Sequence, residues 1–368
     1  MRKNVSCIPG LIFVAVIWFA LSVWCFVKPA DATSYSERRL LAQFPEVSAE
    51  NILTGKFMTE FETYSLDQFP LRDEFRTIKA VSAFYLFGKK DNNDIYISDG
   101  YAAKIEYPLN ENSVNKAADK LTSLYNKYIE GTDAKVYLSV IPDKGFYLAE
   151  PSGYPAMDYE KLISIMKEKM DFADYIDVTD KLSITDYYKT DTHWRQEKIL
   201  DVAEKITSAM GTGAFDSFEE VKTDVPFYGV YYGQSALPLP SESISYVHNE
   251  VMDNCEVYNA ETGKTTAGMI DYGKMNSRDP YEMFLSGATP ILKITNPAGV
   301  KGKELVVFRD SFGSSLVPLL VADYEKVTVV DTRYIVPDYV GNFVDFEGVD
   351  DVLFVYSTVI LNQSEALR

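Results

Sequence analysis

The sequence predicts an α/β fold in which helices cover both faces of a mostly parallel sheet. Runs at 304–308, 327–331 and 352–356 have the length and β-branched composition of buried strands. Elsewhere apolar residues recur at helical spacing, as at 117–128, just ahead of the strand-like run at 135–141. Alternating strands and helices are typical of parallel sheets, because a parallel pair needs a long crossover connection.

The same patterns predict the other elements of the core. Further helices are expected at 159–172, 199–210 and 316–324, and a short strand at 175–178. Residues 212–290 differ, since Gly, Tyr, Ser and Asn are frequent there and no helical period persists. This stretch is predicted to be a β-rich insertion. Its tyrosines Tyr228, Tyr231 and Tyr232 suit either an aromatic sugar-binding rim or, more commonly, packing.

Three regions are predicted along the chain. They are an apolar N-terminal segment at 1–28, a tether with small packing helices at 29–86, and the α/β domain at 87–368. The uncharged run 8–27 is long enough to span a bilayer as a helix, and Arg2 and Lys3 before it place the N-terminus in the cytoplasm. A signal peptide cleaved near Ala30 is the alternative. Either interpretation places the α/β domain outside the cytoplasm.

Charge and composition exclude several function classes. The 368 residues include 36 Lys and Arg against 54 Asp and Glu, a net charge of −18, which repels the phosphates of nucleic acids. Among glycans, a neutral or cationic one suits this negatively charged surface better than an anionic one. Two histidines are too few for a His-rich metal centre, and three cysteines are too few for a disulfide scaffold. Cys255 is predicted to be a buried thiol.

The first candidate site element is Tyr187-Tyr188-Lys189-Thr190-Asp191-Thr192-His193-Trp194. In an extended segment Asp191 and His193 would point the same way, so the carboxylate could hold one ring nitrogen while the other faces a nucleophile. Alternatively, Asp191 or Thr192 is only a helix N-cap and His193 a surface residue. The other histidine, His248, has no Asp at a useful spacing and is the weaker candidate base.

The second element is Phe308-Arg309-Asp310-Ser311-Phe312-Gly313-Ser314-Ser315, which follows a predicted strand and opens a predicted helix. A serine at such a turn lies at the carboxyl edge of the sheet, where open α/β folds place their sites. Alternatively, Asp310 and Ser311 only cap the helix. Together the two elements supply a nucleophile, a base and an orienting acid.

At this level of detail the sequence resembles the DHHW family and its alginate O-acetyltransferase-like relatives in the SGNH hydrolase superfamily. The resemblance rests on the two elements above and on several further motifs, in this order: Ser36-Glu37-Arg38-Arg39-Leu40, Phe44-Pro45, Gly55-Lys56-Phe57, Phe61-Glu62-Thr63-Tyr64, Asp67-Gln68-Phe69-Pro70-Leu71-Arg72, Ile141-Pro142-Asp143-Lys144 and Asp331-Thr332-Arg333-Tyr334. It covers nearly all of the chain after the apolar segment. Thr192 departs from the family name, which has His there.

The resemblance implies a circularly permuted SGNH-hydrolase-like three-layer sandwich. It also implies that Ser311 is the nucleophile, His193 the base and Asp191 its orienting partner. Candidate oxyanion or substrate residues are the backbone N–H of Ser311, together with Gly287, Gln234, Arg333, Tyr334 and Lys144.

The expected activity is O-acetylation of a cell-surface or exported polysaccharide through an acyl-enzyme. The expected partners are the polysaccharide acceptor, a polytopic membrane-bound O-acyltransferase that delivers the acyl group, and the membrane itself. No cofactor or metal is implied. The alternatives are an acetyl esterase of the same superfamily, a non-catalytic carbohydrate-binding component of the export apparatus and, more remotely, a metal-dependent hydrolase.

Overall fold

The computed structural model describes residues 8–213, 215 and 217–368. The chain divides into two compact units. The smaller unit runs up to Asn93 and includes Tyr232–Pro238, and the larger unit comprises Asp94–Tyr231 and Leu239–Arg368. The predicted boundaries at residues 28 and 86 stay predictions.

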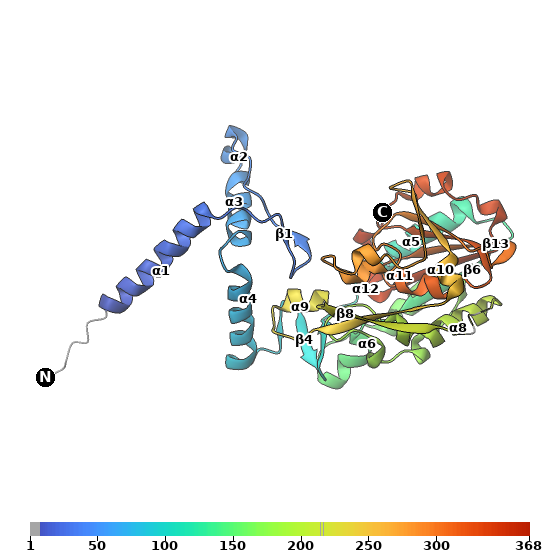
Figure 1. Cartoon of the computed structure of the whole chain (residues 1–368), viewed down its shortest axis with the longest axis horizontal. Helices are drawn as coiled ribbons and strands as arrows, with labels where there is room; N and C mark the ends of the chain where they lie inside the picture. Colours follow the sequence, from blue (N-terminus) through green and yellow to red (C-terminus); the bar gives the residue numbers. More distant parts are fainter. Residues whose placement is uncertain (1–7, 214, 216) are drawn as a thin grey trace. The chain divides into compact units, whose positions relative to one another are not determined.

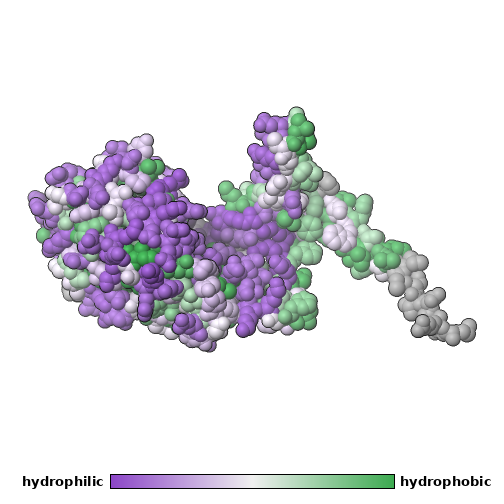
Figure 2. Space-filling view, turned by 180° about the vertical axis from the view of Figure 1, so that it is seen from behind, coloured by the Kyte–Doolittle hydropathy of each residue, from purple (hydrophilic) through white to green (hydrophobic). Residues whose placement is uncertain are grey.

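The smaller unit is built mainly of helices (Figure 1). Its elements are α1 Ile8–Val27, β1 Thr33–Ser34, β2 Arg39–Leu40, α2 Ala49–Leu53, α3 Lys56–Asp67, α4 Arg72–Val81 and β3 Asp91–Asn92. Figure 2 shows apolar side chains along α1 and mostly hydrophilic ones over the α/β unit.

The predicted transmembrane helix is not supported. Within the described part of the chain, no helix is both long enough and apolar enough to cross a membrane. The residues that set its predicted orientation, Arg2 and Lys3, lie outside the described residues.

An ionic network holds the segment after α1 onto α3 and α4. The buried carboxylate of Asp67 accepts two hydrogen bonds from the guanidinium of Arg39, at 2.8 and 2.5 Å, and one from the backbone N–H of Ala42 at 2.9 Å. Glu37 pairs with Arg72 at 2.6 Å and with Arg76 at 3.1 Å. The Glu37–Arg39 and Asp67–Arg72 motifs therefore have a structural role in this unit.

The larger unit is organised around an eight-stranded sheet with strand order β11-β10-β12-β14-β13-β15-β6-β7. The strands are β6 Lys135–Ile141, β7 Asp174–Tyr175, β10 Glu256–Asn259, β11 Lys264–Ala267, β12 Ile291–Thr295, β13 Val300–Arg309, β14 Tyr324–Asp331 and β15 Asp351–Ser357. From β14 to β7 all neighbours are parallel, whereas β12, β10 and β11 add an antiparallel edge. The predicted α/β fold with a mostly parallel sheet is confirmed.

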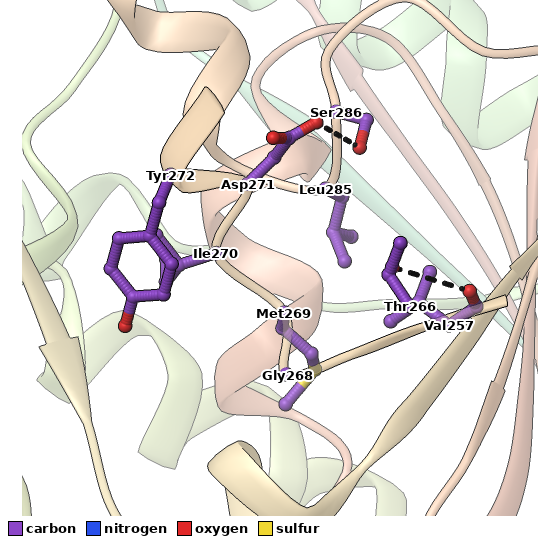
Figure 3. Close-up of a pocket in the computed structure, with 9 residues that line it drawn as sticks. All are labelled: Val257, Thr266, Gly268, Met269, Ile270, Asp271, Tyr272, Leu285 and Ser286. Carbon is purple, nitrogen blue, oxygen red and sulfur yellow. Dashed lines mark hydrogen bonds between the residues drawn. The ribbon is translucent and has the colours of Figure 1, made fainter. Parts of the chain in front are cut away.

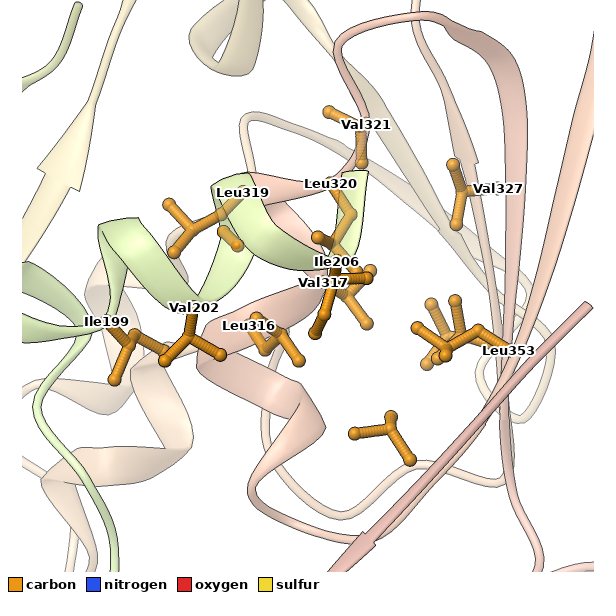
Figure 4. Close-up of a cluster of buried hydrophobic side chains, with 14 of the residues drawn as sticks. Ile199, Val202, Ile206, Leu316, Val317, Leu319, Leu320, Val321, Val327 and Leu353 are labelled. Carbon is orange, nitrogen blue, oxygen red and sulfur yellow. The ribbon is translucent and has the colours of Figure 1, made fainter. Parts of the chain in front are cut away.

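Helices cover both faces of this sheet. Successive strand residues point to opposite sides, and on both sides they are apolar and pack against helices. On one face, Leu305 and Val307 of β13 share a core with residues of α8 and α11. Figure 4 shows part of this core, with Leu316 of α11 near Val202 of α8. On the other face, Val306 and Phe308 of β13 pack with α5 and α7. The helices of this unit are α5 Glu111–Tyr128, α6 Gly145–Leu148, α7 Tyr159–Lys169, α8 Leu200–Met210, α9 Val230–Ser235, which ends in the smaller unit, α10 Glu250–Asn254, α11 Gly313–Leu316 and α12 Thr358–Asn362. The unit thus has three layers, helix, sheet and helix.

The insertion is partly strand, as predicted. Within it, β8 Glu219–Phe227 and β9 Glu242–His248 form a separate antiparallel pair, and β10 and β11 extend the main sheet. Outside it, β4 Ile95–Ser98 and β5 Tyr101–Lys104 form a further hairpin.

Two predicted elements are much shorter than expected. The helix predicted at 316–324 is wrong: α11 ends at Leu316, only a 3₁₀ turn containing Pro318 follows, and Tyr324 already begins β14. Proline lacks an N–H donor and cannot continue a helix. The strand predicted at 175–178 contributes only Tyr175, in β7.

Leu353→Ala should lower the free energy of unfolding by about 2–5 kcal/mol, because a fully buried leucine loses its packing partners and leaves a cavity. Urea denaturation of the full chain measures this change. Val300→Ala is the matched control, since Val300 lies on the same sheet but is 56% exposed, and should change stability by less than about 0.5 kcal/mol. Equal effects of the two substitutions would contradict the assignment of Leu353 to the core.

Candidate active site

Ser311 lies at the carboxyl edge of the sheet, in the turn that joins β13 to α11. The preceding residue, Asp310, is fully buried and shapes this turn. One of its carboxylate oxygens accepts from the backbone N–H of Phe312 at 3.0 Å, and the other accepts from the N–H of Ser357 at 2.8 Å. Because Ser357 ends the neighbouring strand β15, Asp310 fixes the turn against two adjacent strand ends.

Ser311, His193 and Asp191 form one hydrogen-bonded chain. The Nε2 atom of His193 lies 2.8 Å from the Ser311 hydroxyl oxygen, and its Nδ1 atom lies 2.6 Å from Oδ1 of Asp191. A carboxylate can only accept, so Nδ1 carries the proton and Nε2 offers its lone pair to the serine hydroxyl. Asp191 is fully buried, His193 is 8% exposed and Ser311 is partly exposed. The structure therefore brings the three predicted residues together, and their catalytic roles stay a prediction.

The loop that carries Asp191 and His193 is a bend, not the extended segment that was expected. A bridge between Tyr187 and Trp194 closes the loop, and the carboxylate of Asp191 accepts from the backbone N–H of His193 at 3.1 Å as well as from its ring. The turn thus brings the two side chains together.

Neither capping alternative holds. Helix α8 begins only at Leu200, beyond this loop, with Ile199 in the cap position. No side-chain hydrogen bond caps α11, which has Phe312 in the cap position. The Ser311 hydroxyl and the Asp191–His193 pair are therefore not used to cap these helices.

The first residue of α9 and the glycine before it support the Asp191 loop. The backbone N–H of Val230 donates to Oδ2 at 2.8 Å, and the N–H of Gly229 donates to the hydroxyl of Thr190 at 3.0 Å. A Cβ atom at position 229 would lie only 2.2 Å from the backbone nitrogen of Asp191. Only glycine allows this close approach. Tyr231 is buried and donates to the hydroxyl of Thr192 at 3.1 Å, which supports the packing interpretation of this tyrosine.

Three further side chains, whose roles were not predicted, hold the two loops together. The indole N–H of Trp194 donates to the hydroxyl of Ser315 at 2.9 Å, and that hydroxyl also bonds Tyr281 at 2.8 Å. The ring of Tyr281 stacks on His193, with centroids 4.0 Å apart and planes 10° apart. Burial raises the pKa of the Tyr281 hydroxyl. Asp279-Pro280 before it signals a turn in the sequence, but no local pattern indicates the stacking.

Arg333 and Tyr334 differ in their surroundings. Arg333 binds the buried carboxylate of Asp331 at 2.9 and 2.7 Å, and the same carboxylate pairs with the fully buried Arg309 at 3.2 Å. Burial lowers the pKa of Arg309. Tyr334 is 48% exposed, beneath the Arg333 guanidinium.

The other candidate substrate or oxyanion residues have different environments from those expected. The ammonium of Lys144 is buried and donates to backbone carbonyls, so it does not face a substrate. The N–H of Gly287 already donates to Phe284, at 3.1 Å, and its carbonyl accepts from Arg309. Gln234 belongs to the smaller unit, where its carbonyl accepts from Asn93 at 2.8 Å.

The remaining histidine and cysteine have ordinary environments. His248 was expected to have no Asp nearby, but its Nδ1 lies 2.8 Å from Asp253 near the surface. Cys255 is fully buried, as predicted, and burial raises its pKa to about 12. Among the described residues there is no group of three or more His, Cys, Asp or Glu side chains placed to hold a metal ion.

A pocket of about 200 Å³ adjoins the segment that stacks on His193 (Figure 3). Its walls are Val257, Thr266, Gly268, Met269, Ile270, Asp271, Tyr272, Leu285 and Ser286. The segment from Tyr281 to Gly287 contacts His193 through Tyr281 and lines this pocket through Leu285 and Ser286. The lining combines apolar side chains with polar ones, and among the polar ones Ser286 donates to Asp271 at 2.8 Å.

Comparisons with known proteins agree with this fold. A DHHW family protein from Eubacterium siraeum is 20% identical, with a TM-score of 0.62 over 75% of this chain and 94% of its own. Bacillus cereus PatB1 is 17% identical, with a TM-score of 0.60 over 73% and 96% of the two chains, and has also been solved with a sulfonyl adduct. A more remote likeness, with 12% identity and a TM-score of 0.36 over 68% and 82%, is to the O-acetyltransferase domain of Pseudomonas putida AlgJ.

None of the curated proteins matches the chain in sequence. The family model described as "DHHW protein" matches residues 157–330, which include Asp191, His193 and Ser311. The resemblance of this chain to the DHHW family, predicted from its motifs, is thereby confirmed.

Proposed function

We propose that the protein is an extracytoplasmic O-acetyltransferase that modifies hydroxyl groups of a polysaccharide through Ser311. The observation that carries this proposal is the hydrogen-bonded chain from Ser311 through His193 to Asp191, which is the arrangement that activates a serine hydroxyl. The DHHW resemblance supports the acetyl group and the polysaccharide acceptor. The apolar run 8–27 near the N-terminus supports a location outside the cytoplasm.

The proposed reaction has two half-reactions. In the first, Nε2 of His193 takes the hydroxyl proton while Oγ of Ser311 attacks the carbonyl carbon of the acyl donor. The bond to the leaving group breaks, and the leaving group takes the proton from His193. In the second, a sugar hydroxyl gives its proton to His193 and attacks the acyl-enzyme. The Ser311 oxygen then leaves and recovers that proton, so the enzyme ends unchanged.

The backbone N–H of Ser311 is assigned to the oxyanion that forms in each step. Within the described residues this N–H has no hydrogen-bond acceptor, whereas the N–H of Phe312 is used by Asp310 and that of Gly287 by Phe284. A donor held next to the reacting atom stabilises the charge that develops there.

Sugar units of the acceptor next to the one that reacts are assigned to the pocket in Figure 3, whose lining does not include Ser311. Tyr272 is 58% exposed, and an exposed aromatic ring can stack on the apolar face of a sugar. Asp271 and Ser286 can form hydrogen bonds with hydroxyl groups. The negative net charge favours a neutral or cationic glycan. The acyl group would come from a polytopic membrane-bound O-acyltransferase, since acyl thioesters are not available outside the cell.

The order of the site elements supports a circularly permuted SGNH-like fold. Asp191 and His193 precede Ser311 in the chain, which is the order that the family resemblance implies. We assign the permuted arrangement on this ground.

Phenylmethylsulfonyl fluoride should modify Ser311, with loss of fluoride and transfer of the hydroxyl proton to His193. Intact mass spectrometry of the full chain should show one adduct, and Ser311→Ala should abolish it. Ser208→Ala is the matched control, because Ser208 is exposed on α8 and lies outside the site, and should leave the adduct unchanged. An adduct that persists in Ser311→Ala would contradict the assignment of the nucleophile.

Acceptor dependence should separate transfer from hydrolysis. With 4-nitrophenyl acetate as donor, N-acetylchitohexaose or cellohexaose should speed nitrophenol release and gain an acetyl group. Tyr272→Ala should raise the KM for the acceptor about two- to tenfold, because a stacking surface is lost. Tyr272→Phe keeps the ring and should behave like the wild type. Nitrophenol release that no oligosaccharide affects, with no acetylated sugar, would favour an esterase.

A further inference from the structure

The backbone just before Asp191 is held from two sides by groups of opposite charge. The Lys144 ammonium donates to the carbonyl oxygens of Tyr188 and Lys189, at 2.9 and 3.2 Å. The Glu242 carboxylate accepts from the backbone N–H groups of Lys189 and Thr190, at 2.8 and 2.9 Å. The positive ammonium therefore binds carbonyl oxygens and the negative carboxylate binds N–H groups. The two together fix the three residues before Asp191.

Burying the charged side chain of Lys144 at this position costs free energy. It follows the buried strand β6 and is only 2% exposed, and among the described residues its ammonium forms no ion pair with a carboxylate. Besides the two carbonyls, the ammonium faces the rings of Tyr231 at 5.0 Å and Tyr101 at 5.9 Å. Taking an ammonium out of water without an ion-pair partner costs free energy, which hydrogen bonds to two carbonyls offset only in part. Stability alone therefore does not account for a lysine at this position.

We propose that Lys144 is a positioning residue, whose ammonium holds the Tyr188 and Lys189 carbonyls so that Asp191 keeps His193 directed at Ser311. Lys144 also lies near enough to Asp191 for their charges to attract. This proposal rests on the proposed function, because a positioning role requires that His193 act on Ser311.

Because Lys144 is buried, raising the pH should have opposite effects on stability and on activity. Burial lowers the pKa of Lys144 from 10.5 to about 7, although Asp191, Glu242 and Asp143 favour the charged form. Between those two pH values the unfolded chain binds a proton at this lysine that the folded chain lacks, so stability rises with pH. Over the same range the folded protein loses the ammonium charge, so the hold on the loop weakens.

The test compares Lys144→Met with the full-length wild type. The rate of modification by phenylmethylsulfonyl fluoride is measured at about pH 6 and about pH 9, below and above the Lys144 pKa. At the lower pH Lys144→Met should react about tenfold more slowly, because a misplacement of about 1 Å in a catalytic group can cost up to about a hundredfold in rate. At the higher pH the ratio of the two rates should shrink. Using the ratio cancels any titration that both proteins share.

Lys167→Met is the matched control. Lys167 also lies 5.0 Å from a tyrosine ring, that of Tyr175, but it is exposed on α7 and does not touch the Tyr188–Asp191 segment. It should react like the wild type at both pH values. Unfolding by urea, followed by circular dichroism, should show that the rise of stability with pH in the wild type is reduced in Lys144→Met.

Three outcomes would overturn the proposal. A folded Lys144→Met protein that reacts as fast as the wild type at the lower pH would exclude the positioning role and leave the proposed function intact. If Lys144→Met does not fold, Glu242→Gln weakens the hold on the same segment through the N–H groups of Lys189 and Thr190, and a wild-type rate there would show that reactivity does not depend on how this segment is held. A wild-type protein that forms no Ser311 adduct would overturn both the positioning role and the proposed function.

Discussion

The 2.8 Å contact between His193 and Ser311 is the constraint on which the site depends, because it joins side chains 118 residues apart. Each loop needs hydrogen bonds to neighbouring segments to keep its side chain in place. The Ser311 turn is fixed by Asp310 against the end of β15. The His193 loop is fixed by its own closing bridge and by the support for Asp191 from Val230. Both loops then depend on the sheet edge, where parallel strands end side by side.

Much of this edge is polar yet buried, and it lies beside layers that are almost wholly apolar. Asp191, Asp310, Arg309 and Asp331 are all fully buried, and each has hydrogen-bond or ion-pair partners from neighbouring segments. A buried polar group without partners costs roughly 1–3 kcal/mol, so such a set can exist only as a connected network. The apolar layers on both faces of the sheet provide the stability, and the network provides a single arrangement of the site.

The sequence was sufficient for what depends on local pattern. Periodicity predicted the strand at 135–141 and the parallel sheet. Asp191 and His193 are paired as expected, but a bend brings them together and not an extended segment. Pro318 could have corrected the helix predicted at 316–324. The stacking of Tyr281 could not be predicted, because it joins an insertion to a loop far away in the chain. For Gly287, a local turn that no sequence pattern indicated already uses the N–H suggested for the oxyanion, by donation to Phe284.

The place of β15 in the sheet has a consequence for how the molecule is made. Of the eight strands it comes last in the chain, yet it lies between β13 and β6, near the middle of the sheet. During synthesis, β13 and β6 each lack one of their final neighbours until residues 351–357 have been made. Ser357 then completes the support of Asp310. The turn that carries Ser311 therefore gains its full support only after the last strand of the sheet has been made.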